Sequence, residues 1–158
     1  GPGDSFLNRF AGLVRTFPVL PLGGAGARFQ PVYVQDVADV VAEALVRPDA
    51  AGLTCDLAGP TVYTLAELVA YVARLTGRST RIVPLSEPLA LLQAAVLERL
   101  PGPLMSRDNV RSMRADNITG GPPQPWGRTP TALETVAPRW LGRANRRGHF
   151  DAFRKPRP

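Results

Sequence analysis

The sequence predicts a single domain of mixed α/β class, built from short strands and several amphipathic helices. The chain has 158 residues, of which 44% are hydrophobic, enough for one sizeable core. Stretches with apolar residues at helical spacing alternate with short runs of β-branched and aromatic residues, a pattern typical of mixed α/β proteins. These runs are too few and too short for a complete doubly wound sheet.

Helices are predicted where apolar residues recur three and four positions apart. The first follows Asp4 and Ser5, either of which can cap it, and runs to about Thr16 before Pro18 closes the pattern. The other predicted helices span residues 37–46, capped by Asp36; 65–76, capped by Thr64 with Glu67 completing a capping box; 86–100; 107–113; and 130–140, capped by Thr129.

Strands are predicted at residues 29–34, 52–57 and 81–84, and Pro31 confines the first to an edge. Cys55 lies in the second and is interpreted as a small buried hydrophobe. The valines at 32, 34, 37 and 41 are predicted to be core residues. The glycine-rich run 23–26 is interpreted as a hairpin-like turn. A dinucleotide loop is disfavoured because the run leads into a strand and lacks the Gly-x-Gly-x-x-Gly spacing.

The net charge of +6 is concentrated at the C-terminus. Residues 1–139 hold 13 arginines and 12 acidic residues, whereas residues 140–158 hold five arginines, one lysine and one aspartate. We therefore predict a nearly neutral body over residues 1–142 and a basic, disordered tail over residues 143–158. Electrostatic contact of this tail with nucleic acid or anionic lipid is an alternative to a solvated tail, and no sequence-specific nucleic-acid partner is expected.

The chain offers little chemistry of its own. A single cysteine excludes a disulfide scaffold and any multi-cysteine metal site, so no metal is predicted. The only histidine, His149, and the only lysine, Lys155, both lie in the basic tail. No catalytic residue is predicted.

Several ordered segments resemble the extended and atypical short-chain dehydrogenase/reductases. Residues 1–4, Gly-Pro-Gly-Asp, are similar to the turn after the sixth Rossmann strand of that family. Residues 29–38 resemble its Val-x-Asp-Val-Ala segment, and residues 57–68 its Gly-Gly-Pro and Thr-x-x-Glu-Leu segments. Residues 116–118, Asp-Asn-Ile, resemble a segment of the branch that contains the nucleotide-binding accessory subunit of respiratory complex I.

The resemblance implies that residues 1–142 form the C-terminal, substrate-side part of a Rossmann-type protein that lacks its N-terminal dinucleotide-binding half. That missing half is then the first expected partner, and without it the apolar stripes of the helices should lie exposed. The whole protein would bind NAD or NADP, with Gly1 and Pro2 beside the nicotinamide end. The residues implied to border or face the substrate are Phe6, Asn8, Arg28, Phe29 and Gln30.

Of these residues, Arg28 has two interpretations. Its guanidinium can bind a phosphate or carboxylate of the substrate through a forked pair of hydrogen bonds, or it is a solvated arginine at a strand edge. The substrate itself is not identified by the sequence.

The resemblance leaves the activity open. In active members of the family the first part of the chain supplies a Tyr-x-x-x-Lys pair, and in this sequence none of the tyrosines at 33, 63 and 71 has a lysine four residues later. The whole protein either transfers a hydride, as in epimerisation or reduction, or holds its cofactor structurally. The complex I branch favours the second, with complex I as a partner and a location in the cytoplasm or at the periphery of the inner membrane.

The alternative is a stand-alone interaction module. It would dock a partner or a membrane surface through the apolar face of the predicted helix 86–100, which otherwise belongs to the core. That face comprises Leu85, Leu89, Leu92, Val96 and Leu100.

Overall fold

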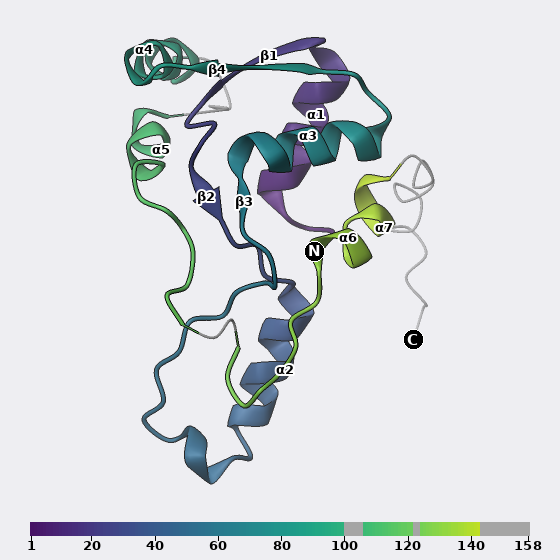
Figure 1. The fold of residues 1–158 in the computed structure, drawn as a ribbon, viewed down its shortest axis with the longest axis vertical. Helices are drawn as coiled ribbons and strands as arrows, with labels where there is room; N and C mark the ends of the chain where they lie inside the picture. The colour runs from purple at the N-terminus through teal and green to yellow at the C-terminus, as the bar shows by residue number, and fades with distance from the viewer. Residues whose placement is uncertain (100–105, 122–123, 143–158) are drawn as a thin grey trace.

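The computed structural model describes residues 1–99, 106–121 and 124–142. Its elements are α1 (Ser5–Thr16), β1 (Val19–Gly23), β2 (Arg28–Phe29), α2 (Val34–Ala44), the 3₁₀ helix η1 (Pro48–Ala50), β3 (Tyr63–Thr64), α3 (Leu65–Thr76), β4 (Arg81–Leu85), α4 (Glu87–Leu97), α5 (Arg107–Ser112), α6 (Leu133–Val136) and α7 (Pro138–Leu141). Helices α1 and α3 lie together near the centre, α4 lies at one end, and α2 lies at the other end (Figure 1). The fold is of the predicted mixed α/β class. The predicted tail falls outside the described residues.

Helix α1 begins and ends where its sequence indicates. The Asp4 carboxylate accepts hydrogen bonds from the backbone N–H groups of Phe6 and Leu7, satisfying donors that the first turn leaves open. Its buried face consists of Leu7, Phe10, Ala11 and Val14. The helix stops at Phe17, before Pro18.

Helix α3 has the predicted capping box at its start. The Thr64 hydroxyl accepts from the Glu67 N–H, and the Glu67 carboxylate accepts from the Thr64 N–H at 2.7 Å. The helix ends at Gly77, which adopts the left-handed conformation with φ 65°. The most deeply buried side chains of the structure include four from this helix: Leu65, Leu68, Val69 and Val72. Helix α3 is therefore the centre of the core.

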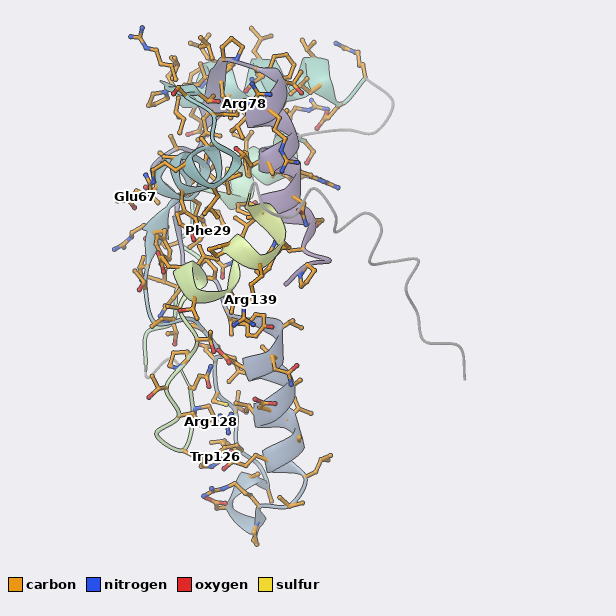
Figure 2. The ribbon with its side chains drawn as sticks, turned by 90° about the vertical axis from the view of Figure 1, so that its right-hand side faces the viewer. Phe29, Glu67, Arg78, Trp126, Arg128 and Arg139 are labelled. Atoms are coloured by element: carbon orange, nitrogen blue, oxygen red, sulfur yellow. The ribbon has the colours of Figure 1, made fainter. Side chains whose placement is uncertain are left out.

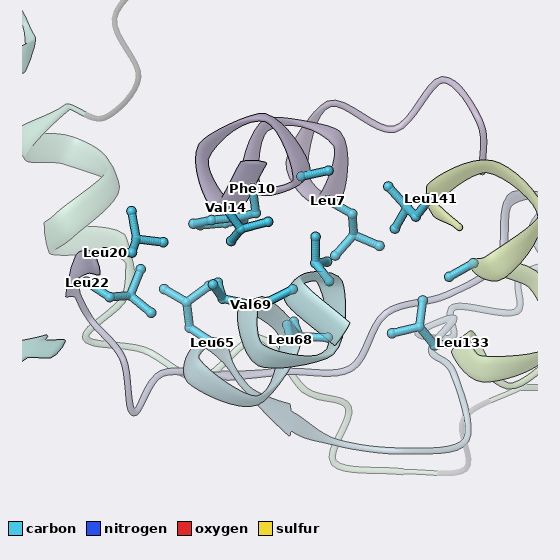
Figure 3. Packing of buried hydrophobic residues seen from close by; sticks show 14 residues of the cluster. Leu7, Phe10, Val14, Leu20, Leu22, Leu65, Leu68, Val69, Leu133 and Leu141 are labelled. Atoms are coloured by element: carbon cyan, nitrogen blue, oxygen red, sulfur yellow. The ribbon is translucent and has the colours of Figure 1, made fainter. Parts of the chain in front are cut away.

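The core forms where α1 packs against α3 and is closed by β1, α6 and α7 (Figure 3). Leu20 and Leu22 of β1 cover one end of this cluster, and Leu133 and Leu141 cover the other. Residues from positions 7 to 141 therefore share one cluster.

Two small sheets connect the helices. Strand β1 pairs in parallel with β4, with Leu20 opposite Ile82, and β2 pairs antiparallel with β3 over two residues each. The prediction of a strand at residues 81–84 is confirmed by β4, but β1 was not predicted. The turn at residues 23–26 is present, with Gly24 at φ 66°, yet it joins strands of different sheets and is therefore not a hairpin.

The strand predicted at residues 29–34 is wrong beyond Phe29. Pro31 has no N–H to donate, and Val34 already begins α2. This helix therefore starts three residues earlier than predicted, with Tyr33 as its N-cap. Asp36 is not the cap. It lies in the first turn and binds another part of the chain.

The strand predicted at residues 52–57 is also wrong. This segment has no partner strand among the described residues, and Leu53 and Cys55 are exposed. Cys55 is therefore not the buried hydrophobe that the alternating pattern predicted. An alternating pattern identifies a face that could be buried, but a strand forms only when a neighbour satisfies its backbone groups.

The helix predicted at residues 130–140 is two short helices. The Thr131 N–H donates to the Asp36 carboxylate instead of to the helix. Ala132 has extended backbone angles, and α6 begins only at Leu133. Pro138 cannot donate an N–H, and it starts α7 as a separate element.

Several residues predicted to be core are exposed. Val34 and Val41 of α2 are more than half exposed, and so are Leu89, Leu92 and Val96 of α4. Among the valines of α2, only Val40 is fully buried. The predicted apolar stripe of α2 is therefore only partly covered. For α4 the predicted face was wrong, because the buried face is formed by Ala90 and Ala94.

Candidate functional site

The N-terminal turn holds the predicted site residues Gly1 and Pro2, and a third, Asn8 of α1, binds it. The Asp4 N–H donates to the Gly1 carbonyl at 2.9 Å. The Asn8 side-chain amide donates to the carbonyl oxygens of Pro2 and Asp4 at 3.0 and 2.6 Å. Asn8 therefore ties this turn to the first turn of α1, and its amide N–H groups are engaged by the backbone.

Phe6 links this turn to the strand β2. Its ring packs at 5.5 Å between centroids against Phe29 and at 5.1 Å, edge to face, against Phe10. Phe6 and Gly1 also line a common cavity of about 200 Å³, together with Tyr33 and Trp140. The structure thus brings Gly1, Phe6 and Phe29 to one region.

Arg28 is paired within the chain. Its Nε lies 2.9 Å and its terminal amino group 2.6 Å from Oδ2 of Asp116, while the Arg28 N–H donates to Oδ1 of the same carboxylate. These hydrogen bonds lower the pKa of the Asp116 carboxyl and raise that of Arg28. The side chain remains 53% exposed, so a substrate anion at this place would compete with Asp116.

Gln30 joins three segments. Its Nε2 donates to the Gly59 carbonyl at 2.8 Å, and its Oε1 accepts from the Thr119 N–H at 3.1 Å. The Gln30 N–H also donates to the Asn117 carbonyl at 3.0 Å. The segments 28–30, 57–60 and 116–119, far apart in the sequence, are thereby fixed beside each other. We call these contacts the Gln30 clasp.

The sequence indicated neither Asp116 nor Gly59 as a member of this region. Both lie in segments that carry the family resemblance, which was the available signal. What the sequence could not show is that they meet Arg28 and Gln30, because these contacts span 88 and 29 residues.

We expect Gly59→Ala to destabilise the chain by about 1–3 kcal/mol, because the added methyl group clashes with backbone. A Cβ at this position would lie 1.9 Å from the Pro31 carbonyl oxygen, so the Gln30 clasp would have to open. Urea unfolding measures the effect. Gly26→Ala is the control, since a Cβ there meets nothing within 4 Å. Equal unfolding midpoints for the two variants would contradict the packing.

Tyr63 of β3 binds Glu134 of α6. The hydroxyl donates to the Glu134 carboxylate at 2.7 Å, and burial together with this hydrogen bond raises the pKa of Tyr63 to about 12. This contact holds the α6 segment against the β2–β3 sheet.

Stability should fall as pH rises from 10 to 12, because unfolded Tyr63 ionises near pH 10 whereas folded Tyr63 keeps its proton until about pH 12. The contribution is present below pH 10 and is lost through pH 12. Tyr63→Phe should flatten this part of the curve of unfolding free energy against pH. An unchanged slope in Tyr63→Phe would exclude Tyr63 as the titrating group.

The residues that the structure describes offer neither a metal centre nor a membrane span. No group of three or more His, Cys, Asp or Glu side chains gathers to hold a metal ion there. In the same ranges no helix has the length and apolar character needed to cross a membrane.

Comparison with known proteins shows the relationship. No protein-family model matches the chain. The chain is 33% identical over 129 residues to NADH dehydrogenase [ubiquinone] 1 alpha subcomplex subunit 9, mitochondrial, of Arabidopsis thaliana, covering 75% of this chain and 32% of that one. It is 42% identical over 87 residues to the protein of that name from Rattus norvegicus, covering 54% of this chain and 23% of that one.

A solved structure, the dTDP-4-dehydrorhamnose reductase of Clostridium acetobutylicum, matches with a TM-score of 0.47 and 18% identity, over 75% of this chain and 40% of that one.

The chain is a homologue of these curated relatives, and its ordered segments resemble the extended and atypical short-chain dehydrogenase/reductases. It is related to alpha subcomplex subunit 9 of NADH dehydrogenase, and the predicted resemblance to this branch is confirmed. The chain spans about a third or less of the length of these relatives. The matches give no support to the alternative of a stand-alone interaction module.

Proposed function

We propose that this chain is the substrate-side part of an NAD(P)-binding protein that holds its dinucleotide structurally and associates with a complex I-type assembly. The relationship to alpha subcomplex subunit 9 supports the association. The resemblance of residues 116–118 to the same branch supports a structural role for the dinucleotide.

The observation that carries the proposal is an uncovered apolar face on α2. Val34, Val41 and Leu45 are 60%, 55% and 85% exposed. Helix α2 extends away from the α1–α3 core, and the segment beside it, with Trp126 and Arg128, leaves these three side chains exposed (Figure 1, Figure 2). Contiguous exposed apolar side chains mark surfaces that pack against something else.

The segment after α2 supports the same interpretation. Residues 52–57 have the alternating pattern of a strand but lie unpaired and exposed. A sheet supplied by an N-terminal dinucleotide-binding half would offer an edge for this segment and a surface for α2. The N-terminal half would then both pair with residues 52–57 and cover the apolar face of α2.

The dinucleotide would approach the N-terminal turn in this arrangement. Gly1 and Pro2 are proposed to lie beside its nicotinamide end, and Gly1 lines the cavity of about 200 Å³. Phe6 and Phe29 would form the apolar wall of the substrate side. Because the Asn8 amide is engaged by the backbone, we assign it a positioning role.

The two remaining polar candidates differ in what they can offer. Gln30 is held in the Gln30 clasp on both sides of its amide and would shape the pocket without binding through that amide. Arg28 would meet an anionic group of the substrate by exchanging Asp116 for it. In this proposal the protein is cytoplasmic or lies at the periphery of the inner membrane.

The test uses the longer gene product that includes residues preceding Gly1. Calorimetry with NADH and NADPH is expected to give one bound dinucleotide per chain, with no oxidation of the bound NADH or NADPH over hours. Absence of dinucleotide binding would overturn the proposal, and turnover of the bound cofactor would overturn its structural role.

A pair of variants tests the α2 face in the same protein. Val41→Asp should weaken dinucleotide binding or prevent folding of the two halves together, because it places a charge in the proposed contact. Val96→Asp on α4 is the matched control, since both valines are 55% exposed. Equal behaviour of the two variants would contradict the assignment of α2 to the N-terminal half.

A further inference from the structure

An apolar groove lies at the end of the molecule away from α2. It has a volume of about 390 Å³, within the range of roughly 300–1,000 Å³ typical of small-molecule sites. Helices α1, α4 and α5 and strand β1 supply its walls. These elements lie in the upper part of Figure 1 and α2 in the lower part, so the groove is separate from the face assigned to the N-terminal half.

The groove has a fixed floor and an open rim. Phe10, Leu20 and Leu22 line it and are also members of the buried core, so packing holds its floor in place. Phe17 and Val19 line it as well, but each is about half exposed. An apolar molecule entering here would remove these two side chains from water.

The charge in the groove lining is positive. Its lining includes Arg9 and no acidic residue. Arg9 is exposed, and no ion pair joins it to a carboxylate within the described ranges. Several other arginines of the structure are paired, among them Arg28 with Asp116 and Arg114 with Glu87. Arg9 is thus available to an anion at the groove.

Gln93 is a second polar residue of the groove lining. Its Nε2 donates to the Pro21 carbonyl at 3.4 Å, and its Oε1 is a buried acceptor without a partner among the described residues. An anion offers no donor to this oxygen, so recognition of an anionic head is assigned to Arg9.

We propose that this groove binds a single-chain anionic amphiphile, with its apolar chain along α1 and its anionic head at Arg9. The apolar lining recognises the chain by burial of its methylene groups, and the guanidinium recognises a carboxylate or phosphate head by charge-assisted hydrogen bonds. This binding needs no dinucleotide, and it shares one residue with the function proposed above, because Phe6 lines both this groove and the cavity at the N-terminal turn.

The test measures binding of dodecanoate to the full 158-residue chain by calorimetry, below the concentration at which dodecanoate forms micelles. The methyl ester of dodecanoate is the neutral comparison. We expect saturable binding of one dodecanoate and at least about tenfold weaker binding of the ester, since a hydrogen bond to a charged group contributes about 1.5–3 kcal/mol. No saturable binding, or equal binding of acid and ester, would overturn the proposal.

Substitutions inside and outside the groove test where the ligand binds. Val19→Trp should fill the groove and abolish binding, whereas Val62→Trp, at an exposed valine outside the groove lining, should leave binding unchanged. Arg9→Met should weaken dodecanoate about tenfold and leave the ester unaffected. Near-ultraviolet circular dichroism confirms that each variant is folded. Binding that survives Val19→Trp, or that Arg9→Met does not change, would refute the assigned site.

Discussion

Leu68→Ala is expected to lower the free energy of unfolding by about 2–5 kcal/mol, the largest effect we predict for a single side chain. Leu68 is 1% exposed and lies where α3 packs against the rest of the core (Figure 3). Truncation removes apolar contacts and leaves a cavity that neighbouring helices fill only in part. A loss of about 3 kcal/mol corresponds to a drop in melting temperature of about 10 °C in a chain of this size.

The matched control is Leu89→Ala on α4. Leu89 is 53% exposed, so its truncation should change the unfolding free energy by less than about 0.5 kcal/mol. Urea unfolding of both variants, with the same slope against denaturant, measures the difference. Equal effects of the two truncations would show that α3 is not the centre of the core.

Asp36→Ala is expected to cost about 2–3 kcal/mol, because it removes a buried carboxylate that accepts two partly buried hydrogen bonds. The Asp36 carboxylate accepts from the N–H of Thr131 at 2.7 Å and from its hydroxyl at 2.8 Å. These bonds join the first turn of α2 to the segment that leads into α6. The variant should therefore also loosen the contact between Tyr63 and Glu134.

Two further variants test the origin of this effect. Asp39→Ala removes a carboxylate that is only partly buried and whose partner Arg128 lies 3.6 Å away, and it should cost less than about 1 kcal/mol. Asp36→Asn keeps one acceptor oxygen and should recover part of the loss. If Asp36→Ala and Asp39→Ala were equally mild in thermal unfolding, the bridge to Thr131 would not be a stabilising contact.

Elements whose cause is local were predicted well. The capping box of Thr64 and Glu67, the stop at Gly77 and the start of α1 at Asp4 all follow from contacts within four residues. Such contacts can be recognised in a sequence, because the residues that make them are neighbours in it.

Elements whose cause is distant were predicted poorly. Asp36 has the features of an N-cap, yet its carboxylate serves Thr131, 95 residues later. Residues 52–57 have the pattern of a strand, yet no neighbour pairs with them in the described chain. The donor that the Asp36 carboxylate binds lies far from it in the sequence. The pattern of residues 52–57 likewise does not show whether a neighbouring strand is present.

The candidate site divides in the same way. The family segments located Gly1, Phe6, Arg28 and Gln30 in the sequence, and the relatives confirmed the family. The structure then showed that the Arg28 guanidinium is paired with Asp116 and that the Gln30 amide is held by Gly59 and Thr119. Their roles toward a substrate stay a prediction.

By itself the sequence determined the branch of proteins that the chain resembles, the positions of the long helices and the caps that begin and end α1 and α3. Only the tertiary structure decided which apolar side chains are covered, which charges are paired and where the cavity and the groove lie. The reason is physical: an apolar stripe or a carboxylate states what a residue needs, whereas the partner that satisfies it depends on which distant segments the fold brings within reach.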